Sequence, residues 1–382
     1  MSAQPYTRKL VTIQKISAIT DIPGADLIAV AAIQGWQVIV KKSEFQVGDD
    51  CLFFEIDSFI PATDERFAFL KKTTTFEGKE GYRLKTMKMK GVISQGLALP
   101  LHMFKEVLDR ITLSTPVPSE DFSEILGVIK YDNEQQEYSQ KPGLKAGKSR
   151  GNFPSFIPKT DQPRIQNLTT YFSTLVDEEF EETLKLDGSS LTAYKIAYIP
   201  TRWEKFKSFF GFKYQDNHFG VCSRNLELKR TANATQTFDN QGKISVYAQS
   251  DFWSTAIKYD LESKLPVGYA IQGELIGPRI QDNHEKVSEL EFYCFDVFNI
   301  NTGSYLLPQD RREFCALHNI PHVPVISTHC TPLQLGLEDL LKHVEGQSMN
   351  PGTVSEGRVY KHVSKPITFK AISNLYLLRS EK

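Results

Sequence analysis

Short strands separated by turns fill residues 8 to 101, and this pattern constrains the fold more than any other feature of the sequence. The apolar runs are RKLVTIQKI, DLIAVAAI, WQVIV, CLFFEIDSFI and YRLKTMKMKGVISQGLAL. Aspartate, glycine and proline separate them in DIPGAD and QVGDD, as expected of strands joined by turns rather than strands alternating with helices. The pattern predicts a small β-barrel, with a helix near residues 102 to 110 beside it.

The sequence changes character after this region. Residues 131 to 158 read YDNEQQEYSQKPGLKAGKSRGNFPSFIP, which is rich in Gln, Lys, Gly, Ser and Pro and poor in periodic apolar positions. Such a composition is typical of a flexible linker. A chain of 382 residues is long enough for two domains. We therefore expect a barrel domain at 1–125, a linker at 126–158 and a second domain at 159–382.

The second domain is expected to be α+β. Its apolar runs predict strands at 181–186, 190–198, 267–276 and 291–299. A helix is expected from residue 159 onward, with Thr160 or Asp161 as its N-cap and Pro163 in its first turn.

Charge and cysteine usage narrow the class of protein. The formal net charge is -1, so a bound polyanion has to be held by local basic patches. The five cysteines are widely spaced without a C-x-x-C pair, which favours reduced, buried thiols over a zinc knuckle or a redox motif. The amino terminus lacks the apolar core of a signal peptide, and no run of about 18 apolar residues follows. We expect a monomer in the cytoplasm or another intracellular compartment, with no membrane partner.

Lys185 begins the string KLDGSS. A bare K-x-D-G string occurs by chance in roughly one chain in ten of this length, and a lysine at such a turn can simply be a solvated loop residue. Five further strings that follow in order along the chain strengthen the interpretation of Lys185 as a functional residue. They are SRN at 223–225, GELIG at 273–277, FYCFD at 292–296, EGRVYK at 356–361 and FKAIS at 369–373.

Each string supplies a group that transfer of a nucleoside monophosphate requires. A lysine is neutral in only about one molecule in a few thousand at pH 7, so a lysine nucleophile needs nearby positive charge or desolvation. Lys370, Arg224 and a bound metal can supply that charge and offset the charge that builds up on the α-phosphate. Glu274 and Glu356 can hold a divalent cation directly or through its waters.

Two further positions suit the nucleotide itself. Gly188 lets the backbone approach a ligand closely, and Phe295 offers a face on which adenine can stack. Taken singly, each string has a simpler interpretation: SRN is a polar turn, FYCFD a buried aromatic strand, and the glutamates and Lys370 solvated residues. Their occurrence together, in this order, favours one nucleotidyl-transfer site.

The ordered set resembles the six signature motifs of the covalent nucleotidyltransferase superfamily, which contains ATP-dependent DNA ligases, RNA ligases and mRNA capping enzymes. The resemblance covers residues 159–382. It implies that Lys185 forms a lysyl-AMP phosphoramidate from ATP, aided by Lys370, Arg224 and Mg or Mn held by Glu274 and Glu356. The nucleotide-binding residues that it implies are Leu184, Lys185, Leu186, Asp187, Gly188, Arg224, Asn225, Glu274, Phe295, Glu356 and Lys370.

One branch of that superfamily, sometimes called the fifth RNA ligase family, carries an OB-like barrel before the transferase domain. The strings GWQVIV, EIDSFIP, KGVISQGL and FIPKTDQPRIQN resemble that branch, whose members seal nicks in duplexes with RNA on the 3'-hydroxyl side. DNA ligases and capping enzymes carry an OB domain after the last motif, whereas 12 residues follow Lys370. Two positions depart from relatives: Leu184 stands where glutamate is frequent, and Thr368 replaces the first lysine of a K-x-K pair, which places more weight on Arg224 or Lys361.

A basic stretch in the barrel region is a candidate nucleic-acid contact. Arg83, Lys85, Lys88 and Lys90 fall within eight positions without an acid among them. The alternative is an edge strand whose lysines discourage strand addition. The spacing prevents all four from sharing one face of a regular strand, so at most two or three can contact one backbone.

The leading functional hypothesis is an ATP-dependent RNA ligase that acts on nicked duplexes. An ATP-dependent DNA ligase or an mRNA capping guanylyltransferase is the alternative within the same class. A nucleic-acid-binding OB protein with an inactive transferase domain is the alternative from another class, and the presence of Lys185, Glu274, Glu356 and Lys370 argues against it.

Overall fold

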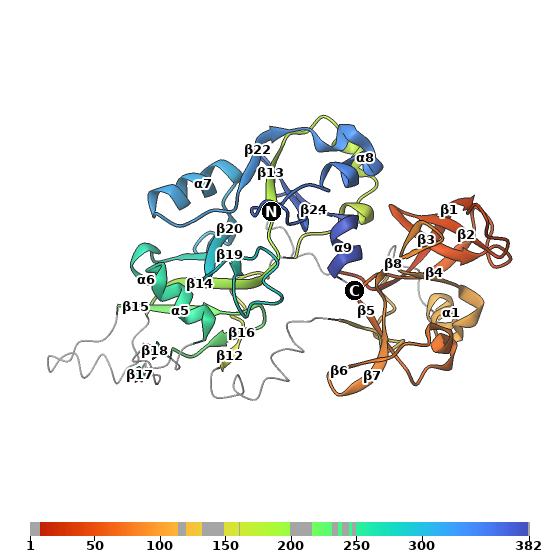
Figure 1. Cartoon of the computed structure of the whole chain (residues 1–382), viewed down its shortest axis with the longest axis horizontal. Coiled ribbons are helices and arrows are strands. Elements are labelled where there is room, and N and C mark those ends of the chain that lie inside the picture. The colour runs from red at the N-terminus through yellow and green to blue at the C-terminus, as the bar shows by residue number, and fades with distance from the viewer. Residues whose placement is uncertain are drawn as a thin grey trace.

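The chain folds into two parts built almost entirely from antiparallel sheets, as Figure 1 shows. The computed structural model describes residues 8–113, 120–131, 149–159, 161–198, 216–230, 236–238, 244–246 and 250–380. We call residues 8–131 the barrel domain and residues 149–380 the two-sheet domain. The last helix, α9 (Asn374–Ser380), lies between them (Figure 1).

One long strand organises the barrel domain. The first half of β1 (Val11–Asp21) pairs with β4 and its second half with β2, and a register shift between Ile16 and Ala18 marks the change of partner. Such a bulge bends a strand so that a sheet can curl. The sheet order is β10-β4-β1-β2-β3. Its other strands are β2 (Ile28–Ile33), β3 (Trp36–Lys41), β4 (Asp50–Phe54) and β10 (Leu97–Pro100).

A second, smaller sheet closes the other side of the barrel domain, in the order β11-β5-β7-β6. These strands are β5 (Ser58–Pro61), β6 (Thr74–Phe76), β7 (Lys79–Arg83) and β11 (Ile129–Lys130). A hairpin of β8 (Thr86–Met89) and β9 (Val92–Gln95) stands beside both sheets. The expected helix is present as α1 (Lys105–Leu113), preceded by a 3-10 turn at Leu101–Met103, and a second 3-10 turn spans Glu65–Leu70.

Two sheets form the core of the second domain. The larger has the order β12-β16-β15-β14-β19-β20-β21 and the smaller the order β22-β13-β23-β24. The larger contains β12 (Ser149–Asn152), β14 (Ser189–Ala197), β15 (Asn217–Cys222), β16 (Leu226–Leu228), β19 (Tyr269–Ile276), β20 (Glu291–Asn299) and β21 (Ser304–Tyr305). The smaller contains β13 (Phe180–Lys185), β22 (Val325–Cys330), β23 (Gly357–His362) and β24 (Thr368–Ile372).

Short helices cover these two sheets. They are α3 (Tyr171–Thr174), α5 (Asp251–Lys258), α6 (Leu261–Lys264), α7 (Pro308–Leu317) and α8 (Gly336–His343). A separate two-stranded ribbon is formed by β17 (Gln236–Phe238) and β18 (Ile244–Val246). The four strands that the sequence predicted in this domain are confirmed as β13, β14, β19 and β20.

The helix expected from residue 159 is wrong. Residues 161–163 have no regular structure, and the helical elements that follow are a 3-10 turn at Ile165–Asn167 and the short helix α3. Pro163 accounts for this, because its carbonyl accepts a hydrogen bond from Lys370 N at 2.9 Å, which draws the segment along β24 instead. Thr160, the other candidate N-cap, lies outside the described residues.

The two ends of the predicted linker belong to sheets. β11 pairs with β5 in the barrel domain, and β12 pairs with β16 in the two-sheet domain. Residues 132–148 lie outside the part that the structure describes. The domain boundaries themselves stay a prediction.

The domains pack against each other through apolar and polar contacts. Ile372 and Leu377, at the end of the chain, are buried in the same core cluster as Trp36 and Phe53 of the barrel. Trp36 Nε1 also donates a hydrogen bond to Asn167 Oδ1 at 2.6 Å. Because these contacts join residues from opposite ends of the chain, the barrel domain holds the last strand and helix in place.

Two expectations about the chain as a whole can be compared with the structure. All five cysteines are free, and all except the partly exposed Cys330 are buried, as predicted. Among the described residues, no helix combines the length and the apolar character needed to cross a membrane.

Candidate active site

Lys185 lies at the end of a strand that has partners on both sides. It is the last residue of β13, which pairs with β22 and β23, and it lies opposite Gly357 of β23. The chain then leaves the smaller sheet through residues 186–188 and enters the larger one as β14. Lys185 is therefore fixed at the crossing between the two sheets, where both can contribute side chains to one site.

A cavity of about 810 Å³ opens at this crossing and brings the predicted residues together. Every position assigned to nucleotide binding lines it: Leu184, Lys185, Leu186, Asp187, Gly188, Arg224, Asn225, Glu274, Phe295, Glu356 and Lys370. A common cavity is what a single nucleotide site requires, although the role of each residue stays a prediction.

Two carboxylates determine the charge state of Lys185. Its Nζ donates a hydrogen bond to Glu356 Oε2 at 2.7 Å. Burial alone would lower the pKa of Lys185, but the charges of Glu356 and then Glu274 outweigh burial and raise the pKa above its usual value. With this pair in place the amine is charged, so it has to leave Glu356 before it can act as a nucleophile.

The acidic groups of the cavity fit a hydrated cation. Asp187 lies near Glu356, and burial together with the charge of Glu356 raises the pKa of Asp187 to about 6. Negative charge is thus concentrated in this part of the cavity, where a cation would offset it. In the described parts of the chain, no three His, Cys, Asp or Glu side chains are close enough to form a metal site alone. Mg²⁺ commonly keeps several waters and uses only one or two carboxylates, so this arrangement is compatible with the predicted roles of Glu274 and Glu356.

Gly188 has a reason to be glycine that the sequence did not reveal. A Cβ at this position would lie 2.3 Å from the carbonyl oxygen of Leu275 and 2.8 Å from Ile276 Cγ2, both in β19. No side chain fits there without moving β14 away from β19. The close approach that requires glycine at 188 is thus to the neighbouring strand.

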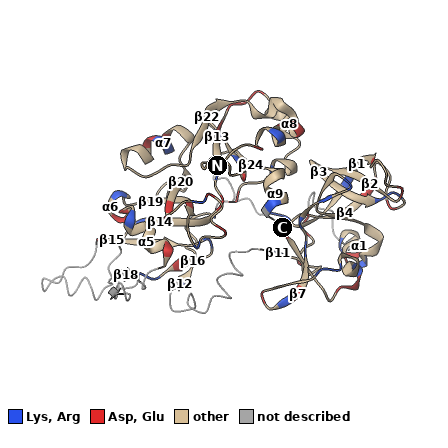
Figure 2. Cartoon of the chain, viewed as in Figure 1, with Lys and Arg blue, Asp and Glu red and all other residues tan. Residues whose placement is uncertain are grey.

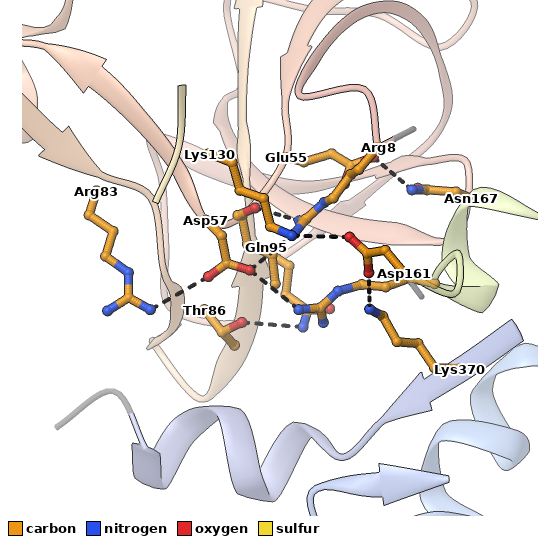
Figure 3. Close-up of polar contacts among 12 residues, drawn as sticks. Arg8, Glu55, Asp57, Arg83, Thr86, Gln95, Lys130, Asp161, Asn167 and Lys370 are labelled. Atoms are coloured by element: carbon orange, nitrogen blue, oxygen red, sulfur yellow. Dashed lines mark hydrogen bonds and ion pairs between the residues drawn. The ribbon is translucent and has the colours of Figure 1, made fainter. Parts of the chain in front are cut away.

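A second group of charges in the cavity centres on Asp161, as Figure 3 shows. Its Oδ1 accepts a hydrogen bond from Lys370 Nζ at 2.8 Å, and its Oδ2 accepts one from Lys130 Nζ at 3.0 Å. Arg224 Nη2 lies 3.8 Å from the same Oδ2. Burial lowers the pKa of Lys370 to about 8, an effect that Asp161 partly offsets and Lys185 reinforces. Basic side chains from both domains therefore pair with the carboxylate of Asp161.

Phe295 and Lys361 lie at another part of the cavity wall. Lys361 Nζ donates to the Phe295 carbonyl oxygen at 2.8 Å and forms a buried ion pair with Asp296. Burial lowers the pKa of Lys361 to about 8, although Asp296 opposes the shift. The lysine is thus tied to the strand that carries Phe295, and the roles of Phe295 as a base platform and of Lys361 in phosphate handling stay predictions.

The basic stretch of the barrel divides into two environments. Arg83 faces inward, with its guanidinium 4.3 Å from the centroid of the Tyr131 ring and 3.5 Å from Asp57. Lys88 and Lys90 are exposed at the tip of the β8–β9 hairpin. Nucleic-acid binding by this stretch stays a prediction, and these two lysines are the members best placed for it. Lys85 is half-buried beside the hairpin. In the view of Figure 2, basic and acidic residues are interspersed over both domains.

Sequence reasoning missed four charged residues that line the cavity, namely Arg8, Lys130, Lys159 and Asp161. Asp161 was interpreted as a helix cap and Lys130 as part of a linker. Arg8 Nε pairs with Glu55 at 2.8 Å, and it lies in the first strand string of the barrel. The only available signal was that Asp161 belongs to the string FIPKTDQPRIQN, to which the resemblance assigned no role.

Comparisons with known proteins match both domains. The RNA ligase family model matches residues 178–372, and a model of an OB-fold domain matches residues 10–101. A search of curated proteins found no match. The expected fold class, an OB-like barrel followed by a sheet-rich nucleotidyltransferase domain, is confirmed.

Solved structures of an RNA ligase from Naegleria gruberi are similar over nearly the whole chain. The structure with pyrophosphate is 35% identical, covers 97% of this chain and 98% of that one, and has a TM-score of 0.79. Structures of two variants, one with AMP and Mn and one with ATP and Mn, show the same identity and coverage, with TM-scores of 0.79 and 0.78.

Proposed function

The chain belongs to the RNA ligase family, and on this basis we propose that it joins a 5'-phosphate to a 3'-hydroxyl through a lysyl-AMP intermediate on Lys185. It is an ATP-dependent RNA ligase, and its relative has been solved with ATP, AMP and Mn. The observation that carries the proposal is the position of Lys185, fixed at a strand end in a cavity between two carboxylates and a basic cluster.

The first step transfers AMP to the enzyme. The neutral Nζ of Lys185 attacks the α-phosphorus of ATP, a nitrogen–phosphorus bond forms, and the bond to the bridging oxygen of pyrophosphate breaks. The ammonium gives up one proton to solvent before the attack, and the nitrogen gives up a second to solvent as the phosphoramidate forms. Lys370 and Arg224 supply positive charge beside the phosphates, and their charge counts for more in this half-buried cavity than it would in water.

A divalent metal at Glu274 and Glu356 would supply positive charge that draws Glu356 away from Lys185 and neutralises the phosphates. The chain itself keeps the Lys185 amine protonated and therefore unreactive until the nucleotide binds. Because Glu356 keeps Lys185 charged, the lysine becomes a nucleophile only when something competes for that carboxylate. Glu356 would therefore release Lys185 for attack when it turns to a bound cation.

Two further transfers complete sealing. An oxygen of the strand's 5'-phosphate attacks the phosphorus of lysyl-AMP, which releases Lys185 and forms an adenylylated 5' end. The 3'-hydroxyl of the other strand then attacks the 5'-phosphorus, a phosphodiester bond forms, and AMP leaves. The same cationic groups can serve all three steps, because each step builds charge on a phosphate in the same cavity.

Labelling with α-labelled ATP tests the intermediate. Wild-type protein should acquire a label that survives denaturation and alkali but is released by acid, as expected of a phosphoramidate, whereas Lys185→Ala should acquire none and still fold. Lys185→Arg should be equally inactive, because a guanidinium of pKa above about 12 cannot lose its proton. Lys195→Ala is the matched control, since its amine bonds to the Glu262 carbonyl at 2.8 Å outside the cavity. Persistent label on either Lys185 variant would reject the proposal.

The substrate is proposed to be a nicked duplex with RNA on the 3'-hydroxyl side, bound by a monomer whose barrel domain holds the duplex. Support for nucleic acid comes from the OB-fold match and from the exposed Lys88 and Lys90. The test compares sealing of nicks whose 3'-hydroxyl strand is all RNA, all DNA, or DNA ending in ribonucleotides. We expect sealing wherever the terminal residues are RNA, and equal sealing of the all-DNA nick would favour a DNA ligase instead.

A further inference from the structure

Asp161 is the residue through which the basic side chains of the cavity are held together. Its partners come from different parts of the molecule: Lys130 from β11 of the barrel domain, Lys370 from β24, and Arg224 from the turn between β15 and β16. Figure 3 shows the carboxylate between Lys130 and Lys370. The side chain is about one-fifth exposed, so its charge is only weakly screened by solvent.

Asp161 is an anion in this setting. Burial would raise its pKa, but Lys370, then Lys130 and Arg224, outweigh burial and hold the pKa well below its usual range. The carboxylate in turn opposes the loss of protons from Lys370 and Lys130, whose pKa values burial lowers. An oxygen anion surrounded by two ammonium groups and a guanidinium is also the environment that proteins build for phosphate.

The position of this cluster suits the leaving end of a triphosphate. In displacement at phosphorus the nucleophile and the leaving group are in line, so pyrophosphate leaves on the side away from Lys185. Lys370 lines the same cavity as Lys185 and Asp161, and the charges of both residues shift its pKa. The cluster is therefore within reach of a triphosphate held beside Lys185. A nucleotide whose α-phosphate is near Lys185 can therefore place its outer phosphates among the cations that Asp161 now holds.

We propose that Asp161 is a stand-in anion that occupies the pyrophosphate site of the nucleotide-free enzyme, and that the outer phosphates of ATP have to displace it. Between turnovers it keeps the cations charged and in position. After AMP transfer it competes with pyrophosphate for the same cations and so speeds pyrophosphate release. Asp161 is thus a positioning residue. The proposal rests on the proposed function, because it takes ATP as the substrate.

The nearby network makes a matched control possible. Asp57 accepts hydrogen bonds from Arg8 at 3.3 Å and Arg164 at 3.4 Å, so it also joins the two domains (Figure 3). Unlike Asp161, it does not line the cavity. Removing the charge of Asp57 should disturb domain packing, whereas its cavity-lining partner Arg8 keeps its ion pair with Glu55 at 2.8 Å and the cations around Asp161 stay paired.

The test is calorimetric binding of inorganic pyrophosphate to full-length protein. Asp161→Asn should bind pyrophosphate roughly tenfold more tightly than wild type, the size of effect expected when one nearby charge of the wrong sign is removed from a partly screened site. Asp161→Glu should bind like wild type, and Asp57→Asn should bind no more tightly. Damage to the fold weakens binding, so a gain in affinity separates competition from a structural role.

Asp161→Ser is the second neutral variant, in case the asparagine variant does not fold. Unchanged or weaker pyrophosphate binding in the folded neutral variants would overturn the inference, as would equal tightening in Asp57→Asn. The KM for ATP and the turnover number should both fall in Asp161→Asn, because product release slows. Wild-type labelling with α-labelled ATP is run in parallel. Its failure would reject the proposed function, whereas unchanged pyrophosphate affinity with normal labelling would reject only the role of Asp161.

Discussion

Replacing Glu356 with glutamine should have opposite effects on two properties of Lys185. The change keeps the shape of the side chain and removes the charge of the oxygen that lies 2.7 Å from the amine. Without nucleotide, the amine should react faster with ordinary amine reagents, because it loses the partner that raises its pKa. Formation of lysyl-AMP should fall by orders of magnitude, because the same carboxylate is the proposed metal ligand.

The size of the first effect follows from the geometry of the pair. Two unit charges 4 Å apart interact by about 4 kcal/mol at an effective dielectric constant of about 20. The side chains of Lys185 and Glu356 are 24% and 14% exposed, so solvent screens part of this energy. We take about 2 kcal/mol as the net loss, which corresponds to roughly a 30-fold increase in neutral amine at pH 7.

The assay is acylation of full-length protein with a limiting amine reagent between pH 7 and pH 9. Modification of Lys185 is quantified by peptide mass spectrometry, and lysyl-AMP formation is measured separately with labelled ATP. Glu262→Gln is the control, since Glu262 pairs with Arg230 outside the cavity. Unchanged or slower acylation in Glu356→Gln would refute the electrostatic argument, and unchanged lysyl-AMP formation would refute the metal role.

Three further outcomes are expected. Glu274→Gln should slow lysyl-AMP formation by orders of magnitude, with partial rescue by excess metal; a normal rate with unchanged metal dependence would contradict this. Changing Lys88 and Lys90 together to Ala should reduce the slope of log binding constant against log salt by up to about 1.8 for a nicked duplex, and an unchanged slope would exclude them as phosphate contacts. Leu377→Ala should lower the free energy of unfolding by about 2 to 4 kcal/mol in denaturant melts, because this side chain is 6% exposed in the barrel core; a loss below about 0.5 kcal/mol would contradict that packing.

The sequence predicted the parts of the fold that depend on local pattern. The strand around Lys185 was found because its apolar residues and the following Asp187 and Gly188 mark a strand end at a turn. The cavity-lining motifs were found because their order along the chain resembles that of a family. Both kinds of signal are contained in short strings.

Contacts between distant residues could not be predicted in this way. Asp161 meets Lys130, 31 positions earlier, and Lys370, 209 positions later, and nothing in the composition around it announces either partner. The same holds for Leu377, which packs in one core cluster with Trp36 and Phe53, more than 300 positions earlier in the chain. These contacts depend on how the two domains pack, and a pattern read along one strand or helix carries no information about that.

The pKa values of the cavity lysines do not by themselves identify Lys185 as the nucleophile. Lys361 and Lys370 have pKa values lowered to about 8, so either is more readily neutral near pH 7 than Lys185, whose pKa is raised. By basicity alone these two would be the better candidates. The choice of Lys185 therefore rests on its position, facing the carboxylates Glu356 and Glu274, because a metal drawn there would release this amine and not the others.

Mapping of the AMP attachment site tests this assignment most directly. Full-length protein is incubated with ATP and Mg or Mn, digested at neutral to mildly alkaline pH, where the phosphoramidate is stable, and sequenced by mass spectrometry. The account predicts AMP on the peptide that contains Lys185 and on no other lysine of the cavity. AMP on Lys361 or Lys370, or noncovalent AMP alone in protein that still seals nicks, would contradict it.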